Sequence, residues 1–138
     1  MSMNRERRRQ AIKVLLADDD PNILALAKFN LELDGFDVVV ADDGHRALEQ
    51  ARSASLDLIV LDLMLPGLSG LEVLAALKAD EATMRIPVFM LTARTAPADR
   101  QAAVEAGASG YLTKPFDPEA LTKRLLDFCG EGGESFGA

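Results

Sequence analysis

A run of three carboxylates, Asp18, Asp19 and Asp20, directly follows the first apolar segment of the chain, and Asp62 directly follows the third. Carboxylates that gather in one place repel each other, and some of them take up protons unless a cation neutralises them. Because these ligands are all oxygens, with no His or Cys beside them, Mg²⁺, or Mn²⁺ in substitution, suits them better than Zn²⁺. If the fold brings these segments together, the sequence predicts a magnesium site.

A hydroxyl and an ammonium group follow the fourth and fifth apolar segments, as Thr92 and Lys114. Together with a divalent cation they could hold the oxygens of a phosphoryl group during its transfer, where catalysis is mainly positioning and charge neutralisation. Carboxylates act as nucleophiles in such reactions and give an aspartyl phosphate. Because Asp62 stands between the acidic triplet and the Thr92 and Lys114 side, we assign it the role of acceptor.

Each of these residues also has a plainer structural interpretation. The acidic triplet could be no more than helix-capping residues, and we expect Asp20 to be a cap in any case. Asp62 could be a turn carboxylate, Thr92 the end of a strand, and Lys114 a surface residue. Only the joint placement of all these residues at one edge of a sheet favours phosphoryl chemistry.

Five short apolar runs are the predicted strands, and several are continuous rather than alternating, which is typical of parallel strands covered on both faces. They are Ile12–Ala17, Phe36–Ala41, Leu58–Leu61, Pro87–Leu91 and Gly110–Thr113. Segments with helical spacing lie between them, and this alternation favours an α/β fold, a three-layer αβα sandwich around a parallel sheet. Ligands of such sheets bind at the carboxyl ends of the strands, where the residues above stand.

Capping signals delimit the predicted helices. Asp20 with Pro21 predicts the start of the first helix, and Gly35 predicts its end. The remaining helices are expected over Arg46–Ala54, around Leu71–Leu77, over Pro97–Ala106 and from Pro118 to Phe128. The aromatic residues expected in the core are Phe29, Phe36, Phe89 and Phe128.

The length of 138 residues fits a single domain, which we place at 12–129, between a basic tail at 1–11 and a flexible tail at 130–138. The first ten residues hold four Arg and one Glu, a charge of +3, so the total of −7 leaves −10 on the remainder. A body this acidic argues against nucleic-acid binding through the folded surface. No apolar stretch approaches the roughly 20 residues of a membrane span. No signal peptide is recognisable either, so we expect a cytoplasmic protein without membrane insertion.

Two residues whose side chains could take part in chemistry are assigned no role. His45 is the sole histidine and stands away from the predicted site, so a solvated surface position is expected. Cys129 is the single cysteine, which excludes an internal disulfide, and it shows no redox motif.

Four stretches of the sequence together resemble the response regulator receiver family of bacterial two-component signalling, including its chemotaxis regulators. They are Val14–Asp20, Leu58–Pro66 with Gly70, Val88–Ala93 and Gly107–Phe116, and the resemblance covers roughly residues 12–128. Each motif alone is weak, but their order, spacing and residue types are jointly specific. The resemblance implies a doubly wound, flavodoxin-like sheet of five parallel strands in the order 2-1-3-4-5.

The resemblance also implies a role for each site residue. Asp62 would be the phosphoacceptor, and Asp19 and Asp62 would bind Mg²⁺ directly, with the main-chain carbonyl of Met64 as a third ligand. Asp18 would hold the metal through water, and Lys114 would contact the phosphoryl group. A cis peptide bond would join Lys114 to the proline that follows it.

Members of the family switch through a Thr and an aromatic residue, which here are Thr92 and Tyr111. On phosphorylation the hydroxyl would move toward the phosphate and the ring would turn inward. The change would appear on the face formed by the helix Pro97–Ala106, the strand Gly110–Thr113 and the last helix. An aromatic residue on an edge strand can equally serve packing alone.

The implied function is a phosphorylation switch rather than a turnover enzyme. The chain would accept a phosphoryl group from a histidine kinase or phosphotransfer protein and control a downstream protein, as a monomer or a phosphorylation-dependent dimer. The acidic pair that commonly precedes the switch Tyr in DNA-binding members is Ser109 and Gly110 here, which puts their dimer mode in doubt. No DNA-binding domain follows residue 128, so we expect a stand-alone or excised receiver without direct nucleic-acid contact.

Three other classes of protein compete with this interpretation. A Mg²⁺-dependent phosphatase with an Asp nucleophile would carry a second Asp two residues later, where Met64 stands. A flavin or nucleotide binder would carry a Gly-rich loop after the first strand, which this sequence lacks. A receiver-like scaffold would bind its partners without phosphorylation, and the presence of Asp19, Asp62, Thr92 and Lys114 speaks against it.

Two positions are expected to tune the lifetime of the phosphoryl group. Met64 lies two residues after Asp62, and Arg94 lies two residues after Thr92, so both would border the path of the hydrolysing water. We expect Met64→Asn to change the dephosphorylation rate with little effect on folding. An unchanged half-life of the phosphoryl group in this variant would contradict the hypothesis.

Overall fold

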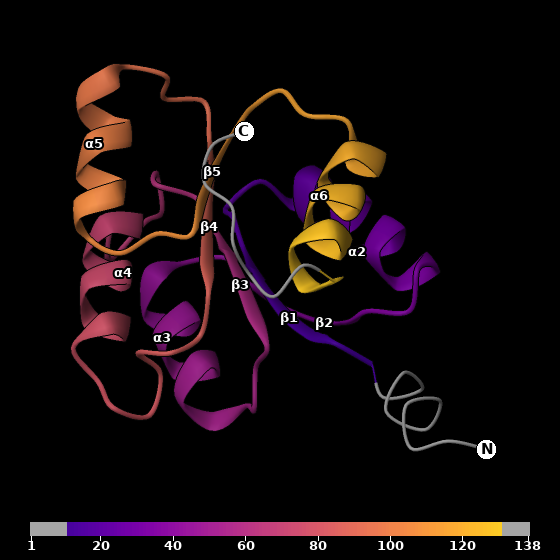
Figure 1. The fold of residues 1–138 in the computed structure, drawn as a ribbon, viewed down its shortest axis with the longest axis horizontal. Helices are drawn as coiled ribbons and strands as arrows, with labels where there is room; N and C mark the ends of the chain where they lie inside the picture. Colours follow the sequence, from indigo (N-terminus) through magenta and orange to yellow (C-terminus); the bar gives the residue numbers. More distant parts are fainter. Residues whose placement is uncertain (1–10, 131–138) are drawn as a thin grey trace.

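A computed structural model describes residues 11–130 of the chain (Figure 1). Five parallel strands form one sheet in the order β2-β1-β3-β4-β5, which confirms the predicted topology. The strands are β1 Lys13–Ala17, β2 Asp37–Ala41, β3 Leu58–Leu61, β4 Val88–Thr92 and β5 Gly110–Thr113. The expected tails lie outside the described residues, apart from Ala11 and Gly130.

Helices cover both faces of the sheet, as expected for a three-layer sandwich: α2 and α6 lie on one face, and α3, α4 and α5 on the other (Figure 1). Asp20 caps α2 as predicted, with its Oδ1 accepting a hydrogen bond from the amide of Asn22 at 2.9 Å. None of the helices within residues 11–130 is long and apolar enough to cross a membrane. The helices are α2 Pro21–Leu33, α3 Gly44–Ser53, α4 Gly70–Lys78, α5 Pro97–Glu105 and α6 Pro118–Gly130.

The core is split into two layers by the sheet, because successive strand residues point to opposite faces. Ile59 and Met90 pack beneath α3, α4 and α5, whereas Val60 and Phe89 pack beneath α2 and α6. All of these side chains are fully buried. The continuous apolar runs of the central strands therefore reflect burial on both faces.

One core prediction is wrong: the Phe29 side chain is 60% exposed. It lies on the outer side of α2, because Ala27 and Leu31 occupy the side of this helix that faces the sheet. The other three aromatic residues expected in the core are buried: Phe36, Phe89 and Phe128.

Several element boundaries differ from the prediction by one or two residues. Thr92 is the last residue of β4 rather than the residue after it, so its main chain still takes part in the sheet. α3 begins at Gly44 instead of Arg46, because Asp43 caps it and accepts a hydrogen bond from the Arg46 amide at 2.7 Å.

Candidate functional site

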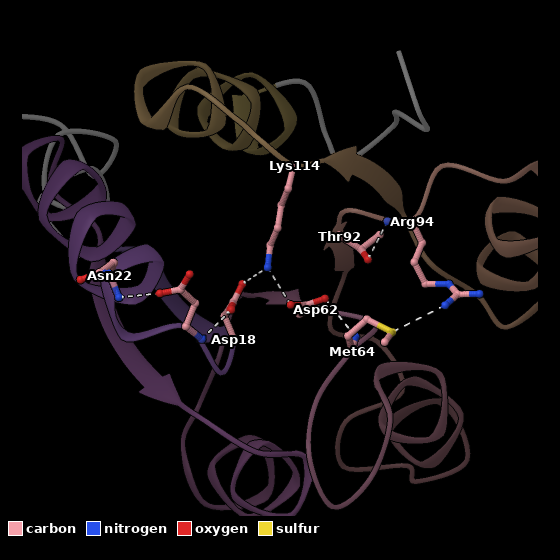
Figure 2. Close-up of polar contacts among 8 residues, drawn as sticks. Asp18, Asn22, Asp62, Met64, Thr92, Arg94 and Lys114 are labelled. Atoms are coloured by element: carbon pink, nitrogen blue, oxygen red, sulfur yellow. Dashed lines mark hydrogen bonds and ion pairs between the residues drawn. The ribbon is translucent and has the colours of Figure 1, made fainter.

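The carboxyl ends of the strands bring together the side chains that the sequence singled out (Figure 2). Asp18 and Asp19 follow β1, Asp62 follows β3, and Lys114 follows β5. One carboxylate oxygen from each of the three aspartates lies within 4.8 Å of the others. Segments far apart in the sequence meet here because parallel strands end at the same edge of the sheet.

Main-chain amides hold the two buried carboxylates in place. Asp18 is 1% exposed and Asp62 is 3% exposed. The amide of Asp62 donates to the carbonyl of Ala17 at 3.0 Å, which fixes the end of β3 against β1. Oδ1 of Asp18 accepts from the amide of Asp20 at 2.9 Å, and Oδ1 of Asp62 accepts from the amide of Met64 at 3.0 Å. Each carboxylate therefore turns its second oxygen toward the centre of the site.

Lys114 is the cation that meets both second oxygens. Its Nζ lies 2.7 Å from Oδ2 of Asp62 and 2.7 Å from Oδ2 of Asp18. Burial alone would lower the pKa of the Lys114 ammonium, but its hydrogen bonds and charge interactions with Asp18 and Asp62 outweigh that effect and raise the pKa. The ammonium group is therefore charged at neutral pH and placed against the carboxylates.

The Asp18 carboxylate is not fully served by this single cation. Burial raises the pKa of Asp18, and the charge of Asp62 adds to the rise, although Lys114 and the Asp20 amide pull the pKa down. Oδ2 of Asp18 lies 2.7 Å from Nζ of Lys114, and no other donor within the described residues reaches it. This buried oxygen is therefore contacted by a cation that Asp18 shares with Asp62.

The donor set fits a hard divalent cation. Three carboxylates, Asp18, Asp19 and Asp62, and one ammonium, Lys114, carry a formal charge of −2. Oδ2 of Asp18, which accepts no hydrogen bond besides its contact with Lys114, and the exposed carboxylate of Asp19 can both act as ligands. Mg²⁺ binds through a few carboxylates and keeps several waters, which matches a site with one open side.

A chain of hydrogen bonds links the end of β4 to β5. The buried Thr92 hydroxyl oxygen accepts from the amide of Arg94 at 3.2 Å. The hydroxyl of Tyr111, whose ring is 4% exposed, donates to the carbonyl of Arg94 at 2.7 Å. Burial raises the pKa of the Tyr111 phenol, and the charge of Asp99 adds to the rise. The peptide at position 94 therefore connects the two residues that the sequence assigned to switching.

The loop after β5 closes one side of the site. The Lys114–Pro115 peptide bond is cis, as expected. A hollow of about 190 Å³ opens beside it, lined by Lys114, Pro115, Phe116 and residues of the first turns of α2. A larger hollow of about 530 Å³ lies between α2 and α6 and contains none of the site carboxylates, so we place the chemistry at the carboxylate cluster and not at the larger hollow.

Two features of the site were given no structural role from the sequence. Gly70 lets the start of α4 approach the end of β3, because a Cβ there would collide with the carbonyl oxygen of Asp62. A glycine at the start of a predicted helix was the available signal. The side chain of Arg94 contacts that of Met64, with Nη1 3.8 Å from Sδ (Figure 2). His45 is exposed as expected, and it lies against Gly67 in the loop after Asp62.

The sequence profile described as "Response regulator receiver domain" matches residues 14–126. The alkaline phosphatase synthesis transcriptional regulatory protein PhoP of Bacillus subtilis (strain 168) is 42% identical over 113 residues, which are 82% of this chain and 46% of that protein. This chain spans about half the length of the curated relatives that it matches.

Solved structures resemble the chain over nearly their whole length. The chemotaxis response regulator CheY4 of Vibrio cholerae has a TM-score of 0.81 and 36% identity, covering 86% of this chain and 98% of that chain. The receiver domain of the sensor histidine kinase PA1611 from Pseudomonas aeruginosa PAO1, which has a magnesium ion coordinated in its active site cleft, has a TM-score of 0.80 and 30% identity, covering 88% and 99%. With its fold, its acidic cluster and its profile match in agreement, the chain belongs to the response regulator receiver family of bacterial two-component systems.

Proposed function

We propose that this receiver domain accepts a phosphoryl group on Asp62 and thereby switches the surface around β5. The observation that supports the proposal most directly is the 2.7 Å contact between Nζ of Lys114 and Oδ2 of Asp62. Asp62 is buried beside Asp18 and Asp19, so charge added at this point interacts strongly with its neighbours. A positioned carboxylate next to a fixed cation suits nucleophilic attack on phosphorus.

In the proposed transfer, an oxygen of the Asp62 carboxylate forms a bond to phosphorus while the bond from phosphorus to the donor breaks. With a phosphohistidine donor, the electron pair returns to the imidazole nitrogen, which then takes up a proton. The Lys114 ammonium stays beside Asp62 and neutralises charge on the phosphoryl oxygens. The Thr92 hydroxyl can donate its proton to one of those oxygens, because in this structure its oxygen only accepts, from the Arg94 amide.

Asp19, Asp62 and the main-chain carbonyl of Met64 are the residues that we propose as direct Mg²⁺ ligands, with Asp18 reached through water. When bound, the ion supplies further neutralisation of the charge on the transferring group. Mn²⁺ would serve in the same place, since it also prefers oxygen ligands. This role is supported by the buried oxygen Oδ2 of Asp18, which has no hydrogen-bond donor besides the shared Lys114 ammonium.

We propose a phosphoacceptor and not a turnover enzyme. In hydrolysis, a water oxygen forms a bond to phosphorus, the acyl phosphate bond breaks, and Asp62 returns as a carboxylate while inorganic phosphate leaves. The residue two positions after Asp62 is Met64, whose thioether can neither give nor take a proton. Hydrolysis without such a general acid or base is expected to be slow.

The proposed switch works through the peptide at Arg94. If the Thr92 hydroxyl turns to donate to a phosphoryl oxygen, the amide of Arg94 loses its partner, and the carbonyl of the same residue holds Tyr111. The ring of Tyr111 is already inside in this structure, so its burial alone does not require phosphorylation. The surface that we expect to change is formed by α5, β5 and α6.

The proposed partners are a histidine kinase or phosphotransfer protein as donor and a downstream protein as target, with residues 12–129 as the receiver domain. Several relatives are named as transcriptional or DNA-binding regulators. We do not extend DNA contact to the receiver body, because the chain after its first ten residues carries a formal charge of −10. A monomer or a phosphorylation-dependent dimer is expected.

Mass spectrometry after incubation with Mg²⁺ and acetyl phosphate tests the proposal. The wild type should gain one labile phosphoryl group, Asp62→Ala should gain none, and Asp42→Ala should label like the wild type because this aspartate is exposed and outside the cluster. Equal label on Asp62→Ala would reject Asp62 as the acceptor and place the phosphoryl group on another residue. An absence of label on the wild type would favour a phosphorylation-independent scaffold.

A further inference from the structure

We propose that Asp99 of α5 sets the lifetime of the phosphoryl group through a latch formed by the side chains of Asp99, Arg94 and Met64; this inference rests on the proposed phosphorylation of Asp62. The latch connects the mouth of the site with a helix that supplies no ligand to it. Asp99 is thus a positioning residue, which acts through Arg94 and Met64 rather than by touching the phosphoryl group.

One guanidinium group makes both contacts of the latch. Nε of Arg94 lies 3.1 Å from Oδ2 of Asp99, and Nη1 of Arg94 lies 3.8 Å from Sδ of Met64. The Asp99 side chain is 20% exposed and the Arg94 side chain 51%. Because the guanidinium is planar and rigid, fixing Nε against Asp99 also fixes the direction in which Nη1 points.

Met64 places the other end of the latch at the mouth of the site. Its amide donates to Oδ1 of Asp62 at 3.0 Å, so its main chain is tied directly to the acceptor. Its side chain is 56% exposed and reaches toward Arg94, on the side of Asp62 away from Asp18 (Figure 2). A thioether is a weak acceptor, so the contact with Arg94 holds only while Arg94 itself is held.

The hydrogen bonds of the Arg94 main chain do not hold its side chain in place. Its amide donates to Thr92 and its carbonyl accepts from Tyr111, which anchor the backbone but not the side chain. The side chain extends from that anchor across the surface, where it forms an ion pair with Asp99 and a weaker contact with Met64. Loss of the Asp99 charge therefore frees the guanidinium without disturbing the peptide that serves the proposed switch.

The consequence concerns the hydrolysing water. Water must approach phosphorus opposite the Asp62 oxygen that becomes the leaving group. The main chain of Met64 is hydrogen-bonded to Asp62 and its side chain contacts Arg94, and in the proposed latch these two side chains narrow that approach. When Arg94 is released, both side chains move more freely and water reaches the phosphorus more often. The lifetime should then shorten, while the transfer onto Asp62 is unaffected because Lys114 and Thr92 keep their positions.

The test measures the half-life of the phosphorylated full chain in Asp99→Asn, after labelling with acetyl phosphate and removal of the donor. We expect a half-life shorter by about two- to fivefold, the range set by an exposed ion pair, with an unchanged labelling rate and an unchanged thermal unfolding midpoint. Asp99→Glu should recover part of the lifetime. Glu105→Gln, which removes a carboxylate from the other end of the same helix, should keep the wild-type lifetime.

A double-mutant cycle separates the latch from a general effect of charge. In a Met64→Ala background, Asp99→Asn should shorten the lifetime by a smaller factor than in the wild type, because the contact between Arg94 and Met64 is already gone. The latch would be overturned if Asp99→Asn left the lifetime unchanged or lengthened it, or if Glu105→Gln shortened it equally. It would also be overturned if Asp99→Asn shortened the lifetime by the same factor in the Met64→Ala background as in the wild type. These outcomes differ from a failure of the proposed function, in which the wild type would take up no label and both proposals would fall.

Discussion

Nζ of Lys114 lies 2.7 Å from Oδ2 of Asp62, although 52 residues separate them in the sequence. The same nitrogen lies 2.7 Å from Oδ2 of Asp18, so one ammonium is shared by two buried carboxylates. Bringing these charges out of water costs free energy that one shared cation does not fully return. Stability and function are therefore opposed at this site.

Asp18→Asn should stabilise the metal-free chain at pH 7 by about 1 kcal/mol, because a neutral amide avoids part of the cost of burying a charge. Burial raises the pKa of Asp18 above its ordinary value of 3.8 in the folded chain. Between the two values the folded state binds more protons than the unfolded state, so stability falls as the pH rises through this interval. The advantage of Asn should therefore shrink as the pH is lowered toward 3.8, which denaturant titrations across pH would measure.

Asp42→Asn is the matched control, since this exposed carboxylate lies outside the cluster and should leave stability unchanged. A loss of stability in Asp18→Asn at pH 7 would mean that its ion pair with Lys114 outweighs burial.

Mg²⁺ should raise the free energy of unfolding of the wild type by about 1.4 kcal/mol at ten times its Kd. Asp19→Asn should lose most of this gain, because Asp19 contributes one of the three clustered oxygens. Asp19 is exposed, so its substitution should not disturb the metal-free fold. Thermal unfolding with and without Mg²⁺ measures both effects, and an equal response in the two proteins would exclude Asp19 as a ligand.

Lys114→Gln should slow phosphoryl transfer on the order of 10², the effect of removing one positioned stabilising donor. It should also destabilise the metal-free chain by about 3 kcal/mol, because Asp18 and Asp62 lose the cation that they share. Lys114→Arg keeps the charge with a different geometry and should recover stability better than rate. The initial rate of labelling by acetyl phosphate and a denaturant titration give the two numbers, and an unchanged labelling rate in Lys114→Gln would exclude the proposed role.

Much of the site could be predicted from sequence because parallel strands confine it. Residues that directly follow continuous apolar runs must lie at the carboxyl edge of such a sheet, and Asp18, Asp62 and Lys114 lie there. The tie between Arg94 and Met64 could not be predicted in this way. It joins two loops 30 residues apart, and the direction of a long side chain depends on packing that strand periodicity does not describe.

The error at Phe29 has a similar physical origin. α2 is apolar on two sides: Ala27 and Leu31 face the sheet, whereas Leu26 and Leu33 are exposed with Phe29. Helical spacing identifies residues that share a side, but two apolar sides leave their orientation undetermined. The small residue Ala27 allows the helix to approach the sheet. Which side of α2 faces inward is therefore decided by packing against the sheet.

Tyr111→Phe should cost about 1 kcal/mol of stability, because the 2.7 Å hydrogen bond from the Tyr111 hydroxyl to the carbonyl of Arg94 is lost. Labelling of Asp62 should continue, since the phenol does not touch the carboxylate cluster. A denaturant titration and the acetyl phosphate assay separate the two effects. Loss of labelling in a folded Tyr111→Phe chain would contradict the separation between the acceptor and the switch.

Phe29→Ala and Phe128→Ala form a matched pair of aromatic truncations on the two helices of one face. Phe128 is buried and packs edge-to-face on Phe89, with ring centroids 4.8 Å apart, so its removal should cost about 3–5 kcal/mol. Phe29 is largely exposed, and its removal should change stability by less than about 0.5 kcal/mol. Denaturant titrations at two protein concentrations give both values. A cost above about 1 kcal/mol for Phe29→Ala that grows with concentration would mean that the outer side of α2 is covered in solution by a second copy, whereas a concentration-independent cost would contradict the exposed position of the ring.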